Sequence, residues 1–282
     1  MYNVSISTNN LTIGYRAGSR KSNAENQRIV QADMTFSLRE GEMVCMLGPN
    51  GCGKSTLLRT LAGLQPALSG DFHLSAEGSL SAQRHDSGSG LSAKQSKSIA
   101  LVLTERLSMD NTTVHDVVAL GRYPYSSFLD GLTAEDEEII STSLEQVGFL
   151  SPSSVQHSFF NAHSDGEKQR ILIAKALAQQ TPIILLDEPT AHLDLPHRIL
   201  VLRLLRRLAH EQGKTILIST HELDLALALS DRILLMSKTE NGKLINANIT
   251  NAKSYYLDTA ANLRQIDAFT SAFGMDIFNP LG

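Results

Sequence analysis

Residues 48–56, with the sequence GPNGCGKST, combine residue types and spacing that suit the binding of nucleotide phosphates. They fit the pattern G-x-x-x-x-G-K-[ST], whose glycines let backbone N–H groups turn inward around phosphate oxygens. In this pattern Lys54 brings a positive charge to the β- and γ-phosphates, and Ser55 brings a hydroxyl to Mg²⁺. The residues expected to contact the nucleotide are Gly48, Pro49, Asn50, Gly51, Cys52, Gly53, Lys54, Ser55 and Thr56.

The segments on either side of this loop predict the elements that must hold it in place. The apolar run 43–47 is typical of a buried strand, and residues 57–62 continue a helix that begins near Lys54. Such a helix points its positive end at a bound anion. This strand–loop–helix context favours a nucleotide site over the alternative, a glycine-rich turn that binds nothing.

Two acidic residues, Asp187 and Glu188, follow a second apolar strand over residues 183–186. In a protein with a phosphate-binding loop, such a strand places its carboxylates beside the phosphates, at the carboxyl end of the sheet. We expect Asp187 to hold Mg²⁺ and Glu188 to polarise the attacking water. Without the loop upstream, the two acids would indicate only a solvated turn.

Three further motifs resemble those of the ATP-binding cassette (ABC) ATPases, over nearly the whole chain. Residues 164–170 (SDGEKQR) resemble the LSGGQ signature, residues 189–194 the D-loop, and residues 218–221 the strand that carries the switch histidine. Tyr15 resembles the aromatic residue that stacks on adenine in this family. The resemblance implies an ATPase (ATP and water to ADP and phosphate) with ATP and Mg²⁺ as its cofactors.

The resemblance also implies a mechanism in which two copies of the chain close head to tail around two ATP molecules. Ser164, Gly166 and Glu167 would then cover the γ-phosphate that is held by the loop of the other copy. Asp194 would pass between the copies, and His221 would contact the γ-phosphate and sense its hydrolysis. The expected catalytic residues are Lys54, Glu188 and His221.

Some positions depart from the family pattern. Glu105 stands where members usually have Gln, and we expect it to join Ser55 and Asp187 as a Mg²⁺ contact, although a carboxylate cannot donate a hydrogen bond. His163 replaces the usual Leu of the signature, Asp165 replaces its first Gly, and Glu167 replaces its Gln. Asp165 should disfavour a nearby triphosphate unless it points away or pairs with a cation.

The alternation of strands and helices predicts an α/β fold, a P-loop NTPase core with a mixed or parallel sheet, an N-terminal antiparallel β subdomain and a helical subdomain. Residues 1–282 are expected to form a single ATPase domain. About 1–104 and 181–240 would form the core with the β subdomain, about 105–180 the helical signature subdomain, and about 241–282 a C-terminal extension.

Four local expectations accompany this fold. Residues 34–38 alternate with period two and predict one strand, while residues 77–97 are rich in Ser, Gly and Lys and indicate an exposed loop. Thr133 is expected to cap a helix that ends at Gly148. Residues 255–273 are expected to form a helix packed on the sheet.

Composition narrows the possible environments. A formal net charge of −4 over 282 residues gives no overall case for nucleic-acid binding. The two cysteines, Cys45 and Cys52, lie in or beside the phosphate loop without metal-ligand spacing, so a reducing cytosol fits best and Cys52 is interpreted as a small filler. We find no apolar run of about 18 residues and no signal peptide, so any membrane role would require a partner.

The segment 113–124 (TVHDVVALGRYP) is similar to the "tV…V..GR.P" stretch of importer ATPases for iron–siderophore complexes, haem and cobalamin, and residues 193–198 resemble their D-loop continuation. This resemblance implies an energy-coupling ATPase, peripheral on the cytoplasmic face of the inner membrane. Its partners would be a second copy, an integral membrane permease and, indirectly, a substrate-binding protein, with no nucleic acid.

Two other classes of function remain open. A soluble cassette ATPase of DNA repair or translation usually carries long coiled-coil insertions or tandem cassettes, and we find neither in the sequence. A nucleotide-binding regulator that does not hydrolyse ATP would not need Lys54, Asp187, Glu188 and His221 all to be intact.

Overall fold

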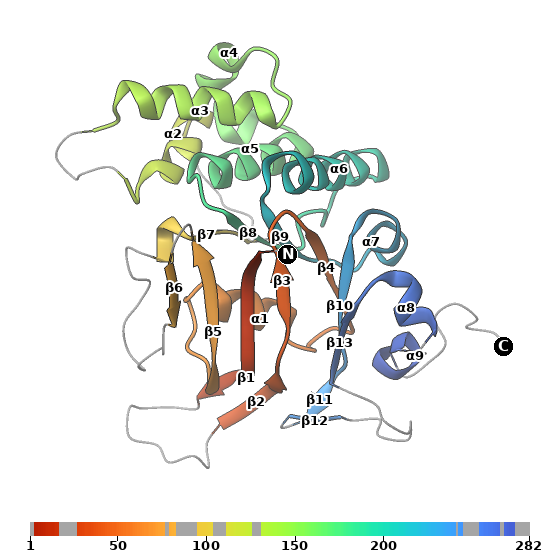
Figure 1. Ribbon diagram of the computed structural model, residues 1–282. Coiled ribbons are helices and arrows are strands. Elements are labelled where there is room, and N and C mark those ends of the chain that lie inside the picture. The colour runs from red at the N-terminus through yellow and green to blue at the C-terminus, as the bar shows by residue number, and fades with distance from the viewer. Residues whose placement is uncertain are drawn as a thin grey trace.

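The computed structural model describes residues 3–16, 27–76, 79–82, 95–103, 111–125, 131–240, 242–244, 254–265 and 268–273. Within these ranges two sheets lie on either side of helix α1 (Lys54–Leu61), and a group of helices lies beyond one end of them (Figure 1). Glu105 lies outside the described residues.

The larger sheet has six strands in the order β13-β10-β4-β9-β8-β7. Its strands are β4 (Met43–Leu47), β7 (Ile99–Val102), β8 (Ile183–Asp187), β9 (Thr215–Ser219), β10 (Arg232–Met236) and β13 (Tyr255–Asp258). All neighbours in it pair in parallel except β10 and β13, which are antiparallel. The predicted mixed sheet is thereby confirmed, and the carboxyl ends of its parallel strands meet at one edge, where ligands of such sheets bind.

The second sheet is antiparallel and contains the N-terminal strands, as predicted. Its members are β1 (Val4–Arg16), β2 (Gln27–Met34), β3 (Ser37–Arg39), β5 (Ser69–Ala76) and β6 (Ser79–Ala82). The single strand expected over residues 34–38 is wrong, because the chain leaves β2 at Met34 and re-enters the sheet at Ser37. At this break, the Phe36 N–H donates to the side-chain hydroxyl of Thr8 in β1 at 3.0 Å, and the Phe36 carbonyl accepts the Thr8 N–H at 2.9 Å.

The exposed loop expected over residues 77–97 is also partly wrong. Residues 79–82 form β6, which pairs with β5, and Gln95–Lys97 form a short 3₁₀ helix, η2. Polar composition did not reveal β6 because its pairing with β5 satisfies the backbone whatever the side chains are. Residues 83–94 lie outside the described part of the chain.

The described residues of the ranges 114–125 and 131–178 are mostly helical, as expected, and form the group of helices at the top of Figure 1. They comprise α2 (Val114–Ala119), η3 (Leu120–Arg122), α3 (Ala134–Gln146), α4 (Pro152–Gln156), η4 (Phe160–Ala162) and α5 (Asp165–Ala178). Thr133 caps α3 as predicted, because its hydroxyl accepts the Asp136 N–H while the Asp136 carboxylate accepts the Thr133 N–H.

The strands of the larger sheet bury both of their faces. In β4, Met43, Cys45 and Leu47 face a cluster that includes α2, α3, α5 and α6 (Leu195–Gln212), while Val44 and Met46 face α1 and the antiparallel sheet. Helix α7 (Leu223–Leu229) packs with the first cluster. Burial on both faces explains why these strands are continuous apolar runs that sequence patterns detect.

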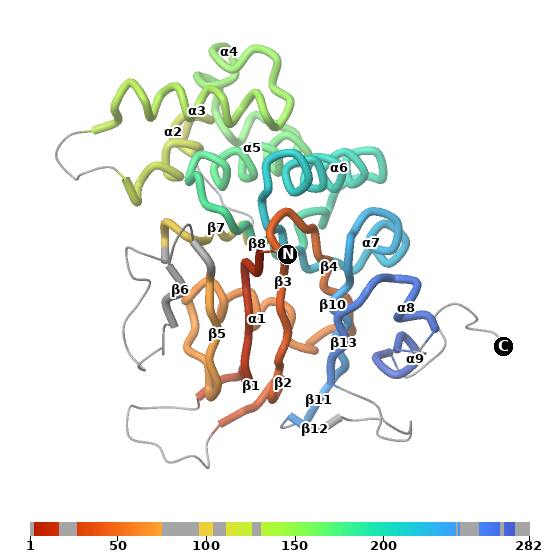
Figure 2. Tube along the Cα trace, in the orientation of Figure 1, coloured from red at the N-terminus to blue at the C-terminus, as the bar shows by residue number. Residues whose placement is uncertain are grey.

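The C-terminal segment does not form the single helix expected over residues 255–273. It contributes β13, then α8 (Ala260–Gln265) and α9 (Ala268–Phe273), and Figure 2 shows it beside β10. The short hairpin of β11 (Thr239–Glu240) and β12 (Lys243–Leu244) precedes it. Strand formation prevails at residues 255–258 because β10 offers an edge to pair with and the aromatic side chains suit a half-buried strand.

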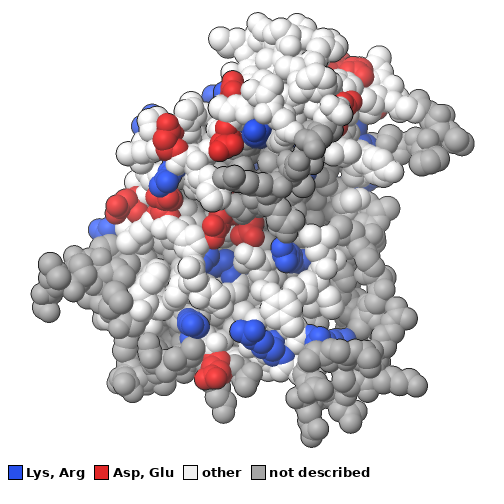
Figure 3. Space-filling view, turned by 180° about the vertical axis from the view of Figure 1, so that it is seen from behind, with Lys and Arg blue, Asp and Glu red and all other residues white. Residues whose placement is uncertain are grey.

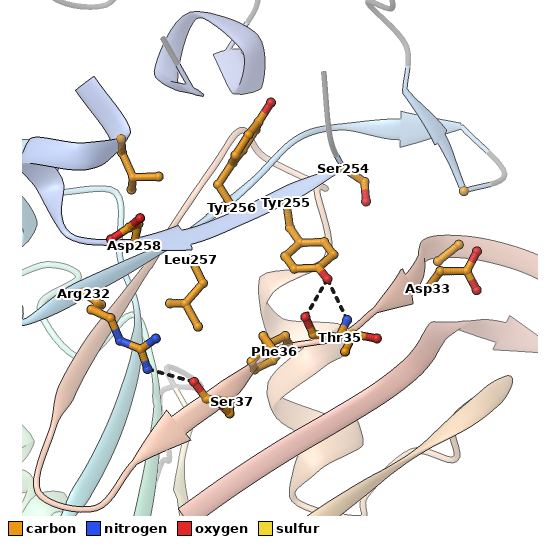
Figure 4. A pocket seen from close by; sticks show the side chains of 13 residues that line it. Asp33, Thr35, Phe36, Ser37, Arg232, Ser254, Tyr255, Tyr256, Leu257 and Asp258 are labelled. Atoms are coloured by element: carbon orange, nitrogen blue, oxygen red, sulfur yellow. Dashed lines mark hydrogen bonds between the residues drawn. The ribbon is translucent and has the colours of Figure 1, made fainter. Parts of the chain in front are cut away.

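A cavity of about 800 Å³ lies between β13 and the β2–β3 segment (Figure 4). The Tyr255 hydroxyl crosses it, accepting the Thr35 N–H at 2.7 Å and donating to the Thr35 carbonyl at 2.8 Å. Arg232 donates to the Ser37 carbonyl at 2.8 Å on the same side. The Tyr255 bonds tie β13, and the Arg232 bond ties β10, to the β2–β3 segment of the antiparallel sheet.

Arg122, in the GRYP part of the sequence, holds three helical elements together. Its guanidinium donates to Asp136 of α3 at 2.7 Å, to the Ala178 carbonyl at 2.8 Å and to the Gln180 side chain at 2.9 Å. Arg122 and Asp136 are only 4% and 5% exposed. At the neighbouring Gly121, an added Cβ would lie 2.3 Å from the Lys175 carbonyl, so only glycine allows this close approach.

Arg122→Ala is expected to lower the free energy of unfolding by about 3 kcal/mol, because it leaves a buried carboxylate without its cation. Urea denaturation measures this change, and exposed Arg203→Ala is the control, expected to stay within about 0.5 kcal/mol of the parent. The Thr133 N–H and then Arg122 lower the pKa of Asp136 below its ordinary 3.8. Asp136 therefore contributes stability above that pH and loses it as the pH falls through the lowered pKa. A change for Arg122→Ala no larger than that of the control would contradict the structural role.

Candidate active site

The phosphate-binding loop lies between β4 and α1 and depends on glycine at two positions. Gly48 has φ +154°, and an added Cβ would lie 2.2 Å from the Met236 carbonyl oxygen. Gly53 has φ +108°, and its Cβ would lie 2.6 Å from a methyl of Val30. Any larger residue at either position would displace the loop.

Lys54 and the N-terminus of α1 direct positive charge toward this loop. The Lys54 ammonium donates to the Gly48 carbonyl at 2.8 Å and to the Pro49 carbonyl at 3.4 Å, and the residue is 6% exposed. Among the described residues, no side chain caps α1 and its first turn has no acidic member. The backbone N–H groups at this end are therefore available to an anion.

Ser55, Asp187 and Ser219 meet beside the loop. The Ser55 hydroxyl donates to Oδ1 of Asp187 at 3.1 Å, and the Ser219 hydroxyl donates to the same oxygen at 2.5 Å. Asp187 ends β8 and is 8% exposed. A hydroxyl and a carboxylate both offer oxygen atoms, the ligands that Mg²⁺ prefers. In nucleotide sites Mg²⁺ is usually bound by one or two such protein groups together with phosphate oxygens. The residues present thus fit the ion that the sequence predicts.

Glu188 and His221 form a second pair at the same sheet edge. His221 Nε2 lies 2.5 Å from Oε1 of Glu188, and both side chains are partly exposed. Glu188 has φ +47°, an unusual backbone conformation for a residue other than glycine. The structure therefore brings the predicted water-polarising carboxylate and the predicted switch histidine together.

Tyr15 lies at the mouth of the loop. Its hydroxyl hydrogen-bonds to the Thr56 hydroxyl at 2.9 Å, and the side chain is exposed. Cys52 is buried, and burial raises the pKa of its thiol, which keeps it protonated near neutral pH. Asn50 and Gly51 are exposed on the loop surface.

Gln31 of β2 contacts the loop, and the sequence analysis did not identify it. Its amide donates to the Cys52 carbonyl at 2.9 Å and to the Ser237 carbonyl at 2.7 Å, and the residue is fully buried. It joins the antiparallel sheet, the loop and the end of β10. Its place in an alternating strand gave no local signal of this contact.

The signature-like segment forms the N-terminus of α5. The Ser164 hydroxyl and N–H both bond the Glu167 carboxylate, at 2.8 and 3.0 Å, and they lower its pKa. Asp165 is exposed, whereas Gly166 is buried beside His197 of α6. The His163 ring nitrogen Nε2 lies 2.6 Å from the Ser158 hydroxyl, and Nδ1 lies 3.6 Å from Glu167.

Asp194 caps the N-terminus of α6. Its carboxylate accepts the His197 N–H at 3.1 Å and approaches Nδ1 of the same residue at 2.5 Å, and these contacts lower its pKa. An added Cβ at Gly166 would lie 2.7 Å from the His197 ring, so the beginnings of α5 and α6 pack together. The predicted site residues thus form two groups, one around the loop and one at these two helix ends.

The fold and the first group define a P-loop ATPase, in which a phosphate loop and two strand-end acids share one edge of a sheet. The sequence profile of the family described as "ABC transporter" matches residues 31–191. The chain belongs to the ABC transporter family, and it is an ATPase of that family.

Two solved structures and one relative illustrate this membership. The iron(3+)-hydroxamate import ATP-binding protein of Bacillus subtilis is 35% identical over 234 residues, which cover 83% of this chain and 79% of that protein. A metal-chelate type ABC transporter in an inward-facing conformation is 26% identical, with a TM-score of 0.75, over 97% of this chain and 90% of that one. A dimeric ATP-binding cassette bound to ADP and phosphate is 25% identical, with a TM-score of 0.66, over 86% and 97%.

Proposed function

We propose that the chain is the energy-coupling ATPase of an ABC importer for a metal chelate, such as an iron–siderophore complex, haem or cobalamin. The observation that carries its ATPase part is the meeting of Lys54, Ser55, Asp187, Glu188 and His221 beside one loop. The import part is supported by the printed names of the relative and of the metal-chelate type structure.

In the proposed reaction, Lys54 and the N-terminus of α1 bind the phosphates, while Tyr15 stacks on adenine. Ser55 and Asp187, joined by Glu105, would hold Mg²⁺, which would supply positive charge beside the phosphates when bound. Glu188 orients a water molecule and accepts its proton, and His221, 2.5 Å away, contacts the γ-phosphate.

We propose that two copies complete each site. Ser164, Gly166 and Glu167 would reach the γ-phosphate of the partner copy, and Asp194 would cross between the copies. The packing of the α5 and α6 N-termini against each other supports this, because it presents both segments together. The dimeric cassette with ADP and phosphate also supports it. A two-fold homodimer satisfies this requirement with one kind of chain.

We further propose that the helical region, about residues 105–180, contacts an integral membrane permease at the cytoplasmic face of the membrane. Leu120, the first residue of η3, and Tyr123, which directly follows η3, are 51% and 69% exposed, which leaves apolar surface for a partner. A substrate-binding protein would act through that permease.

The remaining parts of the chain would belong to the same domain, with about 1–104 and 181–240 as its core and about 241–282 as its extension. Among the described helices, none has both the length and the apolarity to span a bilayer.

An ATPase of DNA repair or translation is the alternative reading. On the face seen in Figure 3, the acidic side chains of the described residues lie mostly in the upper half and at the centre, and most charged side chains in the lower half are basic. Nucleic-acid binding usually uses a concentrated basic surface. The net charge of −4 gives no overall case for nucleic-acid binding, and together with the printed names of the relatives it favours the importer.

The test is to tag the chain, solubilise native membranes gently and identify the proteins that co-purify. We expect a polytopic permease of the metal-chelate type. The double variant Leu120→Glu with Tyr123→Glu is expected to reduce permease recovery at least about 10-fold, because it places charge in a contact that would be desolvated. Leu150→Glu, which alters a leucine that is 99% exposed on the same helical region, is the matched control. Recovery of soluble partners alone from an intact complex would overturn the transport role.

A further inference from the structure

Ser219 connects the two acidic residues of the site. It is the last residue of β9, lies in register with Asp187 of β8 and is fully buried. Its hydroxyl oxygen lies 2.5 Å from Oδ1 of Asp187 and 2.9 Å from the backbone nitrogen of Glu188. The Ser219 backbone carbonyl accepts the same Glu188 N–H at 3.1 Å.

The chemistry of the partners fixes the direction of these bonds. An ionised carboxylate only accepts hydrogen bonds, so the Ser219 hydroxyl donates its hydrogen to Asp187. The hydroxyl lone pairs are then free to accept the Glu188 N–H. One hydroxyl therefore orients the carboxylate of Asp187 and the backbone of Glu188 at once.

The second of these contacts acts on a strained residue. Glu188 has φ +47°, a left-handed backbone conformation that is unfavourable for a residue other than glycine. The Glu188 N–H is shared between the hydroxyl and the carbonyl oxygen of Ser219, and this holds the Glu188 backbone in that conformation. The side chain leaves the backbone there and reaches His221 at 2.5 Å, so a turn of this peptide would move the carboxylate away.

The first contact acts on the predicted metal ligand. Oδ1 of Asp187 accepts from both Ser55 and Ser219, which sets the rotation of the carboxylate. If Ser55 turned its oxygen toward a metal ion, the bond from Ser219 would remain. Asp187 would then keep its orientation when the ion binds.

We propose that Ser219 is a positioning residue for ATP hydrolysis, which holds Asp187 for the metal ion and Glu188 for the attacking water. The inference rests on the proposed ATPase role of these two acids. Ser219 itself would not touch ATP, since both of its side-chain bonds go to protein groups. Loss of the Ser219 hydroxyl is therefore expected to change turnover and its dependence on Mg²⁺, and to leave the binding of ATP unchanged.

The test compares purified Ser219→Ala with the parent for kcat, for KM, for the Mg²⁺ concentration at half-maximal rate, and for the binding of a fluorescent ATP analogue. We expect kcat to fall about 10-fold, which corresponds to about 1.4 kcal/mol, and half-maximal Mg²⁺ to rise several-fold. Affinity for the analogue should change by less than about two-fold. Ser219→Thr retains the hydroxyl and is expected to recover most of the rate and the parent Mg²⁺ dependence.

Thr215→Val is the matched control. Thr215 is the first residue of the same strand, is fully buried, and its hydroxyl donates to the Arg39 carbonyl at 3.2 Å, away from the two acids. Its loss should lower the melting temperature while leaving kcat and Mg²⁺ dependence unchanged. If Ser219→Ala does not fold, Ser219→Cys provides the comparison, because a thiol is a weak donor of similar size.

Unchanged kcat and Mg²⁺ dependence in Ser219→Ala would overturn the inference, and so would an equal loss in Thr215→Val. In either case hydrolysis by the parent chain would leave the ATPase role standing. Absence of Mg²⁺-dependent hydrolysis in the parent, assembled with its permease, would instead overturn the proposed function. The parent and the variants thus separate the two claims.

Discussion

Glu188→Gln is expected to lower steady-state ATP hydrolysis at least about 100-fold while leaving ATP binding nearly unchanged. The amide has almost the same shape as the carboxylate, but it cannot accept a proton from the attacking water. The Glu188 carboxylate lies 2.5 Å from His221 and is partly exposed, so it can reach a water molecule beside the phosphates. Phosphate release measures turnover, and a fluorescent ATP analogue measures binding.

Glu222→Gln is the matched control for this prediction. Glu222 lies next to His221, is as exposed as Glu188 at 31% against 32%, and bonds Arg198 at 2.5 Å instead. We expect its turnover to stay within about two-fold of the parent, as for a surface ion pair away from the reaction. Turnover that survives Glu188→Gln would show that another group takes the proton.

Lys54→Ala is expected to weaken ATP binding at least about 10-fold, since it removes a buried cation from the phosphate loop. In the structure the ammonium is held by the Gly48 and Pro49 carbonyls, within reach of the space that the loop encloses. Lys54→Arg should not restore binding, because a planar guanidinium does not replace a slender ammonium in a tight loop. Equilibrium binding of the ATP analogue measures both variants.

Lys214→Ala controls for the loss of a half-buried lysine. Its ammonium donates to the Thr181 carbonyl at 2.8 Å, at the opposite end of the parallel strands from the loop. Its removal should cost some stability and leave ATP affinity within about two-fold of the parent. An ATP affinity of Lys54→Ala equal to that of this control would contradict the assignment of the loop.

The sequence predicts the central strands well because their signal is local. The runs at β4, β8, β9 and β10 are apolar except at some of their end residues, as burial on both faces requires, and the structure confirms them as strands. The sequence does not predict the strand β13, because its signal is not local. Its conformation depends on the edge of β10, which lies about twenty residues earlier in the chain and far from any local pattern.

The candidate site divides in the same way. Lys54, Asp187 and Glu188 could be predicted because phosphate chemistry fixes both their types and their spacing. Ser219 and Gln31 could not, since their contacts arise only when β8 pairs with β9 and when β2 crosses the loop. The role of Glu105 stays a prediction, because that residue lies outside the described part of the chain.

The pairing of β13 with β10 also bears on how the protein avoids aggregation. Without β13, the buried strand β10 would form an edge of the large sheet and present a row of unsatisfied N–H and C=O groups. Such an edge is a template for a strand from another molecule. The C-terminal segment, which carries no predicted catalytic residue, therefore protects the fold by occupying the place that a foreign strand would take.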